Sequence, residues 1–323
     1  MVMTRPRGVL VPLVRTVVVL AAVPLLAGCR ATSAGATDPS PTPPSAASGR
    51  DEGGSTVDRS DSATEEANLA AVLSLYTEAF PDPGSSEAAA TAERVVAADA
   101  VAHGSGRQAG PGGLLAEFTA DRGRVPGAQA VVKRTAADGE LVAVHYQVAS
   151  DPADERTGEA AVDLFRLEGG TVVERWSFDQ PIATGTPASG NTNTMFSDLY
   201  DPPAPAVAPS ETEEESNRVL AVNAYDTLFR DQDVSILDTA FDPAYLQHNP
   251  VAPNGTEALK SLFSGSATFP PQESVVSLGD GDLVWTFSQS VGAEPGDPVL
   301  AADVFRVDDG LIREHWDVVP AAD

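Results

Sequence analysis

The chain has 323 residues, with 47 acidic and 20 basic side chains and a formal net charge of −27. Such a field repels nucleic acid and anionic lipid headgroups, so neither is expected as a partner. The single cysteine excludes an intramolecular disulfide, and the length favours two domains over one. Stability is therefore expected to come from packed apolar cores.

Residues 1–28 have the pattern of a secretory signal peptide. Three arginines precede an apolar run from Thr16 to Leu26, and small residues follow up to Cys29. The run is shorter than the roughly 20 residues that a spanning helix needs. The segment resembles a bacterial lipoprotein signal, whose cysteine is acylated and becomes the mature N-terminus. This resemblance implies an exported lipoprotein, anchored through palmitate-type chains on Cys29 to the outer face of the cell membrane. If the signal is removed, three arginines leave with it and the net charge becomes −30.

Two low-complexity segments divide the rest of the chain. Residues 29–64 are rich in Ser, Thr, Ala, Pro and Gly, so a disordered tether is expected there. Residues 200–213 contain four prolines and lead into the acidic run Glu213-Glu214-Glu215. Prolines and like charges favour an extended chain, which predicts a linker at this point.

The two remaining segments, 65–199 and 214–320, repeat one pattern. The spacing between matched residues drifts only from 149 to 140, so the differences are short loops. A repeat of this length indicates a duplicated domain rather than a solenoid. The matched pairs are Asn68 and Asn217, Tyr76 and Tyr225, His103 and His248, Asp163 and Asp303, Arg166 and Arg306, Glu174 and Glu314, and Trp176 and Trp316.

Each copy begins with helical periodicity and ends with strands. In the second copy, one face of a helix is predicted from Val219, Val222, Tyr225 and Phe229. Asp-Gly and Gly-Gly pairs between β-rich runs are hairpin signals. The order predicts an α+β fold with helices packed on one face of a curved antiparallel sheet. The predicted strands of the second copy are residues 275–278, 283–289, 299–307 and 311–318.

Several motifs of the second copy occur in a fixed order. They are Tyr245-Leu246-Gln247-His248-Asn249-Pro250, Gly281-Asp282-Leu283-Val284, Asp303-Val304-Phe305-Arg306 and the run from Gly310 to Asp317. In this order they resemble the SnoaL-like proteins of the nuclear transport factor 2-like, or ketosteroid isomerase-like, superfamily. The first copy shows a weaker resemblance. The family implies two tandem cone-shaped α+β barrels, each open at one end around a small-molecule pocket. Its activities are cofactor-free ring closure, isomerisation and dehydration, so no cofactor is expected.

His315 and Asp317 are the predicted catalytic pair, and His248 is the third catalytic candidate. Residues two apart on a strand share a face, so both are expected inside the cone, while Glu314 and Trp316 point outwards. A neutral imidazole beside a carboxylate is a proton acceptor near pH 7. Abstraction of a proton next to a carbonyl group also needs a hydrogen-bond donor for the enolate oxygen.

Four further residues are predicted to contact the ligand, namely Tyr245, Asn249, Asp303 and Phe305. Tyr245, Asn249 or His248 would be the donor to the enolate oxygen, and Asp303 would orient a histidine. One alternative stays open for His315, which would line the pocket without chemistry. Another is that His248-Asn249-Pro250 forms a turn.

No metal is expected. His248, His315 and Asp317 are ligand types that suit iron or zinc, but they lack the tight spacing of a metal motif.

The first copy lacks the catalytic pair. Arg175 and Ser177 stand at the positions of His315 and Asp317, so this copy reads as a partner domain or a degenerate pocket. His145 is a lone strand histidine, for which a packed role is the ordinary interpretation. If Trp176 and Trp316 face outwards, the two copies would pair through their sheets and the protein would be a monomer with an internal pseudo-dimer.

The leading hypothesis is a lyase or isomerase that acts on an enolisable carbonyl compound in the second pocket. The alternative is a non-catalytic lipoprotein that holds an apolar ligand or a partner. The pair in the second copy favours the enzyme, whereas its loss in the first favours the binding protein.

Overall fold

The computed structural model describes most of the chain beyond the predicted tether. The described residues are 57–104, 107–188, 194–202, 209–264, 270–294 and 297–320. The predictions for the signal peptide, for Cys29 and for most of the tether lie outside these residues. Within them, no helix is long and apolar enough to span a membrane.

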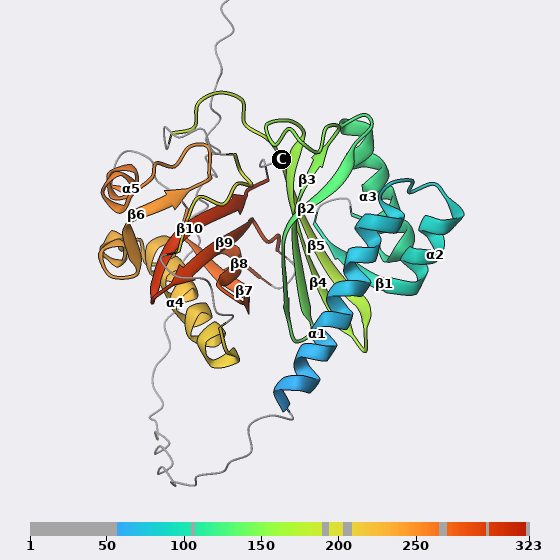
Figure 1. The fold of residues 1–323 in the computed structure, drawn as a ribbon, viewed down its shortest axis with the longest axis horizontal. Helices are drawn as coiled ribbons and strands as arrows, with labels where there is room; N and C mark the ends of the chain where they lie inside the picture. Colours follow the sequence, from blue (N-terminus) through green and yellow to red (C-terminus); the bar gives the residue numbers. More distant parts are fainter. Residues whose placement is uncertain are drawn as a thin grey trace, which may run out of the picture. The chain divides into compact units, whose positions relative to one another are not determined.

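The first domain packs three helices and a π-helical turn against a five-stranded sheet (Figure 1). The strand order is β1-β5-β4-β3-β2, in which β1 runs parallel to β5 and the other neighbours are antiparallel. Helix α1 packs against β2 and β3. The elements are α1 (Val57–Ser74), η1 (Leu75–Ala79), α2 (Ser86–Val95), β1 (Val96–His103), α3 (Gly110–Arg124), β2 (Gln129–Asp138), β3 (Leu141–Ala149), β4 (Glu159–Glu168) and β5 (Thr171–Pro181).

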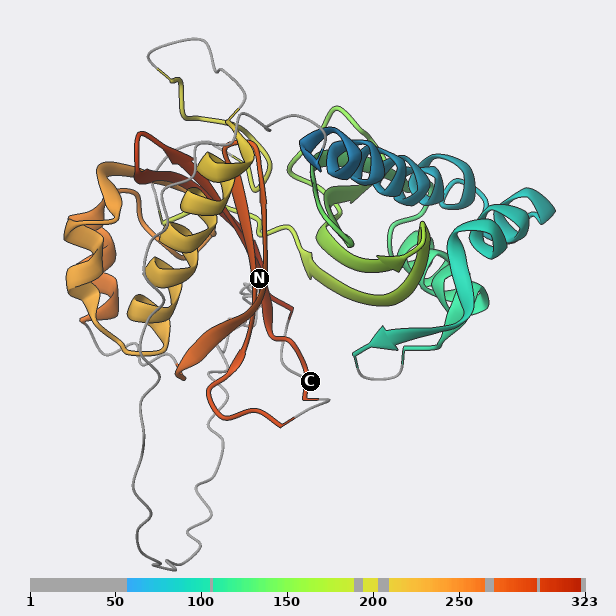
Figure 2. The ribbon, with the colours of Figure 1, turned by 90° about the horizontal axis from the view of Figure 1, so that it is seen from below.

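The second domain repeats this arrangement with one helix fewer. Its strand order is β6-β10-β9-β8-β7, again with a parallel first pair and antiparallel neighbours. Helix α4 lies along one face of the sheet, against β7 and β8 (Figures 1 and 2). The elements are α4 (Glu211–Phe229), the 3₁₀ turn η2 (Val234–Asp238), β6 (Phe241–Gln247), α5 (Thr256–Phe263), β7 (Gln272–Asp280), β8 (Leu283–Ser290), β9 (Ala301–Asp308) and β10 (Leu311–Val318).

The identical strand order confirms the prediction of two tandem α+β domains of one fold. The predicted meander was incomplete, because each sheet gains a parallel strand, β1 or β6, at the edge beside the last strand. Residues 241–247 were not among the predicted strands. Their β pairing depends on β10, which lies about 70 residues away and leaves no local signal.

The predicted hairpin turns form where glycine or aspartate can adopt positive φ. Gly169 and Gly170 join β4 to β5 with φ of 58° and 82°. Asp309 and Gly310 join β9 to β10 with φ of 50° and 68°. Two consecutive positive φ values match the right-handed twist of the flanking strands, so these turns fix the register of β4 with β5 and of β9 with β10.

The tether and the linker both end earlier than predicted. Helix α1 begins at Val57, inside the predicted tether, and α4 begins at Glu211, inside the predicted linker. The acidic run that suggested an extended chain is the first turn of α4. Ser210 and Glu213 form a capping box, and carboxylates at a helix N-terminus are stabilised by the helix dipole.

The buried face of α4 differs from the predicted one. It consists of Ala221, Ala224, Tyr225 and Leu228, whereas Val219 is 55 % exposed. The helix packs closely on the sheet through small alanine side chains. The face predicted from the valines is therefore offset by about one residue from the face that contacts the sheet.

Each cone has its own apolar core between helices and sheet, and a third cluster joins the outer faces of the two sheets. We call it the shared cluster. Phe178 and Phe287 pack there with ring centroids 5.7 Å apart, and Trp316 is fully buried in it. Its members are Ala136, Ala143, Ala160, Val162, Leu164, Phe178, Met195 and Phe196 with Leu278, Trp285, Phe287, Ala302, Val304, Trp316 and Val318.

Candidate functional site

A cavity of about 450 Å³ lies inside the second cone, between α4, α5 and the concave face of the sheet. Its volume is within the usual range for small-molecule sites, and most of its lining is apolar. The aromatic and aliphatic lining residues include Tyr225, Leu228, Phe229, Phe241, Tyr245, Leu259, Leu262, Phe263 and Phe305. Its polar lining includes Gln247, Asn249, Gln272, Asp303, His315 and Asp317.

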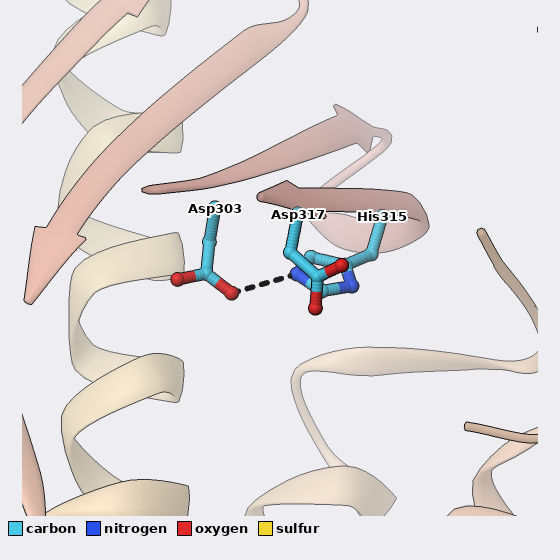
Figure 3. Close-up of side chains that lie close together, drawn as sticks. All are labelled: Asp303, His315 and Asp317. Carbon is cyan, nitrogen blue, oxygen red and sulfur yellow. Dashed lines mark hydrogen bonds and ion pairs between the residues drawn. The ribbon is translucent and has the colours of Figure 1, made fainter. Parts of the chain in front are cut away.

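Strands β9 and β10 bring the acid–base groups together, as Figure 3 shows. Alternation along β10 places His315 and Asp317 on the cavity face. Asp303 of β9 is the direct cross-strand neighbour of Asp317, and Phe305 is that of His315. Because the two carboxylates stand opposite each other, the charge of Asp303 opposes ionisation of Asp317.

Gln247 determines the protonation of His315, and sequence reasoning missed it. Its Oε1 accepts the backbone N–H groups of His248 and Asn249, each at 2.9 Å, which fixes the amide orientation. The same Oε1 lies 2.9 Å from Nδ1 of His315, so Nδ1 must carry a hydrogen and donate it. Gln247 is two residues from Tyr245 on β6, so the two side chains share a face of the strand. If β6 had been predicted as a strand, this spacing would have placed Gln247 at the cavity beside Tyr245.

The other nitrogen of His315, Nε2, lies 2.9 Å from Oδ1 of Asp303. With Nδ1 already a donor, a proton must also lie between Nε2 and this carboxylate. Burial by itself lowers the pKa of His315, but the hydrogen bond to Asp303 and the charges of Asp317 and Asp303 outweigh it and raise that pKa. The raised pKa favours the imidazolium form of His315, and both ring nitrogens are engaged, so neither is free to receive a proton from a ligand.

Asp317 keeps one oxygen free. Its Oδ2 accepts a hydrogen bond of 2.5 Å from Nδ2 of Asn249, whereas its buried Oδ1 has no hydrogen-bond partner within the described residues. Burial is the main cause that raises the pKa of Asp317 to about 6, with Asp303 adding to it and His315 opposing it. A buried carboxylate of this pKa can accept and return a proton near neutral pH.

Tyr245 is placed to donate to a ligand. The residue is buried and lines the cavity, and its hydroxyl oxygen accepts a hydrogen bond of 3.4 Å from Nε2 of Gln247. Its own hydroxyl hydrogen remains available for an acceptor. Asn249 also lines the cavity, but one of the two hydrogens on its Nδ2 is given to Asp317, whereas none of the described residues takes the hydroxyl hydrogen of Tyr245. Of the three proposed donors, Tyr245 is therefore the one whose hydrogen is not already shared with Asp317.

His248, predicted as a catalytic residue, lies on the opposite side of the sheet. Its Nε2 pairs with Glu314 at 2.8 Å, its Nδ1 with the carbonyl oxygen of Thr194 at 2.6 Å, and its ring stacks on Trp316. The backbone N–H of His248 donates to the carbonyl oxygen of His315 at 3.0 Å, so His248 is near the pair, but its side chain does not join His315 and Asp317 at the cavity. The reason is that His248 follows a strand, β6, beside Glu314 on the outward face of β10.

The first domain contains the same outward arrangement. His103 pairs with Glu174 at 2.9 Å and stacks on Trp176, and Arg166 pairs with Glu174, as Arg306 does with Glu314. His103 and His248 thus have the same structural role in the two copies, each pairing with a glutamate and stacking on a tryptophan. The repeat indicated this role, because the histidine is present in the first copy although that copy lacks the acid–base pair.

The cavity of the first domain is filled by ion pairs, in agreement with the expectation of a smaller pocket. Its volume is about 10 Å³, too small for more than one water. Arg175, at the position of His315, is almost fully buried and pairs with Glu117. Burial is the main cause that raises the pKa of the neighbouring Asp121 to about 7. His145 is packed against Phe196 on the outer face, where burial holds its pKa well below the usual value.

Asp303, His315 and Asp317 offer ligand atoms within 4.8 Å of one another, and among the described residues they form a cluster that could hold a metal ion. The two-histidine set weighed from the sequence does not form, because His248 is bound to Glu314 on the other face. In the cluster that does form, the contact between Nε2 of His315 and Asp303 is a hydrogen bond. A metal would have to displace this proton, so no step is derived through one.

Residues 57–175 match the family model of the SnoaL-like domain. The first domain is a SnoaL-like domain. The match falls on the copy whose motifs gave the weaker resemblance, while the second domain shares its strand order. No curated protein matches the chain.

Several solved structures resemble one domain-sized part of the chain. IdmH, a candidate polyketide cyclase from Streptomyces antibioticus, is 21 % identical over 35 % of this chain and 91 % of its own, with a TM-score of 0.28. A candidate polyketide cyclase from Bacillus cereus is 17 % identical over 35 % and 74 %, with a TM-score of 0.30. A candidate SnoaL-like isomerase from Agrobacterium tumefaciens is 15 % identical over 36 % and 98 %, with a TM-score of 0.30. Likeness at this level assigns no activity.

Proposed function

We propose that the cavity of the second domain binds a partly apolar compound with an enolisable carbonyl group, and that Asp317 transfers a proton at the carbon beside that carbonyl. The observation that carries this proposal is the free Oδ1 of Asp317, buried beside an apolar cavity of about 450 Å³. Proton transfer between a carboxylate and an enolisable carbon requires no redox cofactor.

Each polar group of the cavity has a distinct part in this reaction. Asp317 accepts the proton through Oδ1, while Asn249 holds Oδ2 and so fixes the carboxylate plane. The hydroxyl of Tyr245 donates to the enolate oxygen that forms, and a donor already in place stabilises that charge. The imidazolium of His315 stays bound to Gln247 and Asp303 and supplies positive charge beside Asp317. The base predicted from the sequence was His315; its hydrogen bonds favour Asp317 instead.

The reaction class that follows is an isomerase or lyase step. Return of the proton to another carbon gives isomerisation, and attack of the enolate on a second carbonyl group of the same molecule gives ring closure. The known activities of SnoaL-like proteins include both, and the polar groups described here do not distinguish between them.

Non-catalytic binding is the second candidate. It is favoured by the first domain, whose cavity is filled by Arg175 and Glu117 and cannot perform the proposed chemistry. It is also favoured by the predominance of apolar side chains in the second cavity.

The direct test is exchange of ketone α-protons for deuterium in heavy water, followed by NMR on a panel of cyclic and aryl ketones. Asp317→Asn keeps the shape and removes the base, so exchange should fall by about 10²–10⁴. Ser177→Ala, at the matching position of the first domain, is the control and should exchange at the wild-type rate. Equal exchange by wild type and Asp317→Asn would refute the proposed base, and ligand binding without exchange would favour the binding protein.

A further inference from the structure

The cavity of the second domain is lined in part by the first domain. Gln180, near the end of β5, and Ala183, just beyond it, are among the cavity residues. They line the cavity together with Asn249, Pro250 and Val319 of the second domain. The second cone is therefore not complete by itself.

Hydrogen bonds hold this segment of the first domain in place. The backbone N–H of Val319, two residues beyond Asp317, donates to Oε1 of Gln180 at 2.6 Å. The N–H of Ala188 donates to the carbonyl oxygen of Pro250 at 2.9 Å. The segment 180–188 is thus fixed to the second domain near both of its ends and forms a border of the cavity with a defined position.

The chemistry of this border is mixed. Ala183 is exposed, as are Val251 at 71 % and Val319 at 44 %, so an apolar rim surrounds the opening. Oε1 of Gln180 is held by Val319, and one hydrogen of its Nε2 faces Sδ of the buried Met195 at 3.8 Å. The amide carries a second hydrogen, and because Gln180 lines the cavity, that hydrogen can be donated to an acceptor on a bound molecule.

We infer that the first domain determines which ligands the second cavity accepts. Gln180 and Ala183 limit the entrance to an elongated, partly apolar molecule. Its inner end reaches Asp317, and its outer end presents a hydrogen-bond acceptor, such as an ether or carbonyl oxygen, to Nε2 of Gln180. This inference rests on the proposed function only in that the cavity must bind a small molecule. It gives the first domain, whose own cavity is filled, a role in the site of the second.

The test uses the full chain and two fluorescent methyl ketones, 2-acetonaphthone and its longer 6-methoxy derivative. Both have an enolisable methyl group, and only the second carries an acceptor at the far end. In wild type, the methoxy compound should bind about threefold to tenfold more tightly, the value of one net hydrogen bond. Gln180→Glu keeps the oxygen that accepts from Val319 and removes the donor, so this preference should disappear.

Ala183→Phe tests the entrance itself. The exposed alanine tolerates a larger side chain, which should weaken the longer ketone at least tenfold and the shorter one less. Ala120→Phe, on an exposed position of α3, is the matched control and should change neither affinity. Thermal unfolding of each variant reports whether the fold is intact.

The outcomes separate this inference from the proposed function. An Ala183→Phe protein that is folded and binds both ketones as wild type does would overturn the role of the first domain. The same holds for a wild type without preference between the ketones. Wild-type binding with the expected preference but no α-proton exchange would overturn catalysis and leave this inference intact. Absence of binding by either ketone would overturn both.

Discussion

The Nε2 atom of His315 donates to Oδ1 of Asp303 at 2.9 Å, and not to Asp317, although Asp317 is two residues away on the same strand. Asp303 lies on the neighbouring strand, opposite Asp317. This single contact decides the assignment of roles in the site. It engages the second nitrogen of His315 and one oxygen of Asp303. Oδ2 of Asp303 and Oδ1 of Asp317 both lack a hydrogen-bond partner within the described residues, and Asp317 is the carboxylate that is not bonded to His315.

His315 should therefore carry both ring protons at neutral pH. Its raised pKa arises because the hydrogen bond to Asp303 and the neighbouring carboxylates outweigh burial. Asp303→Asn removes the strongest of these favourable contributions, so the pKa of His315 should fall below its wild-type value. Nitrogen-15 NMR of the imidazole over a pH titration measures the protonation of His315 in wild type and its pKa in Asp303→Asn. A neutral His315 at pH 6 in wild type would contradict the imidazolium that we infer from the contact with Asp303, and a ring without a hydrogen on Nδ1 would contradict the contact with Gln247.

Asp317→Asn should increase stability while it removes activity. The pKa of about 6 lies above that of an unfolded aspartate, so the contribution of this group to stability is complete below about pH 4 and is lost as pH rises through 6. At pH 7.5 the variant should gain on the order of 1–2 kcal/mol, and at pH 4 almost nothing. Urea unfolding at the two pH values measures the difference.

The same pKa predicts the pH dependence of the wild-type reaction. The base must be ionised, so the rate of α-proton exchange should rise from pH 5 to pH 7 with a midpoint near 6. A rate that falls over this range would show that the protonated form of Asp317 is the active one, and would reverse its role.

His248→Ala should lower stability and leave ligand binding unchanged. It removes one partner of Glu314, whose carboxylate is fully buried, also accepts the backbone N–H of Leu199 and still pairs with Arg306. Loss of a buried hydrogen bond to a carboxylate should lower the free energy of unfolding by about 1–3 kcal/mol.

The matched control for His248 is His103→Ala in the first domain. There the pair with Glu174 is 33 % and 26 % exposed, so the loss should be about 0–1 kcal/mol. If a folded His248→Ala protein no longer bound the ketones, His248 would have a role in ligand binding and this prediction would be wrong.

The sequence predicted the duplication, four of the five strands in the second sheet and the cavity-facing side of β10, because these depend on local alternation and turn residues. It also predicted that Asp303 would orient a histidine, which the contact with His315 agrees with, but not that Asp303 would take the place of Asp317 as the partner of His315. That choice depends on the position of Gln247 on β6, and the pairing of β6 with β10 is a contact between distant segments. The error for His248 has a different cause. The family motif suggested a pocket residue, whereas the repeat of His103, Glu174 and Trp176 indicated a structural group.

The lipid anchor remains a prediction, since residues 1–56 lie outside the described part of the chain. Cys29→Ser should abolish acylation, leave the precursor uncleaved and move the protein out of the detergent phase. More than one acyl chain is expected, because a single chain of myristoyl length binds membranes only marginally. Phase partition and intact mass measure these effects. A Cys29→Ser protein that still carries a diacylglyceryl mass would refute the lipoprotein signal.

The final prediction is that the chain is monomeric and unfolds in one transition. The shared cluster already covers the outer faces of both sheets, and Arg134 of the first domain lies over Trp316 of the second at 3.7 Å from the ring centroid. Because the two domains share this cluster, neither should unfold without exposing the other. Light scattering should give the mass of one chain, and calorimetry a single peak.

Phe287→Asp, in the shared cluster, should destabilise the protein by more than about 3 kcal/mol, whereas Val101→Asp on the exposed edge strand β1 should have little effect. A stable dimer, or two separate unfolding transitions in wild type, would contradict the internal pairing.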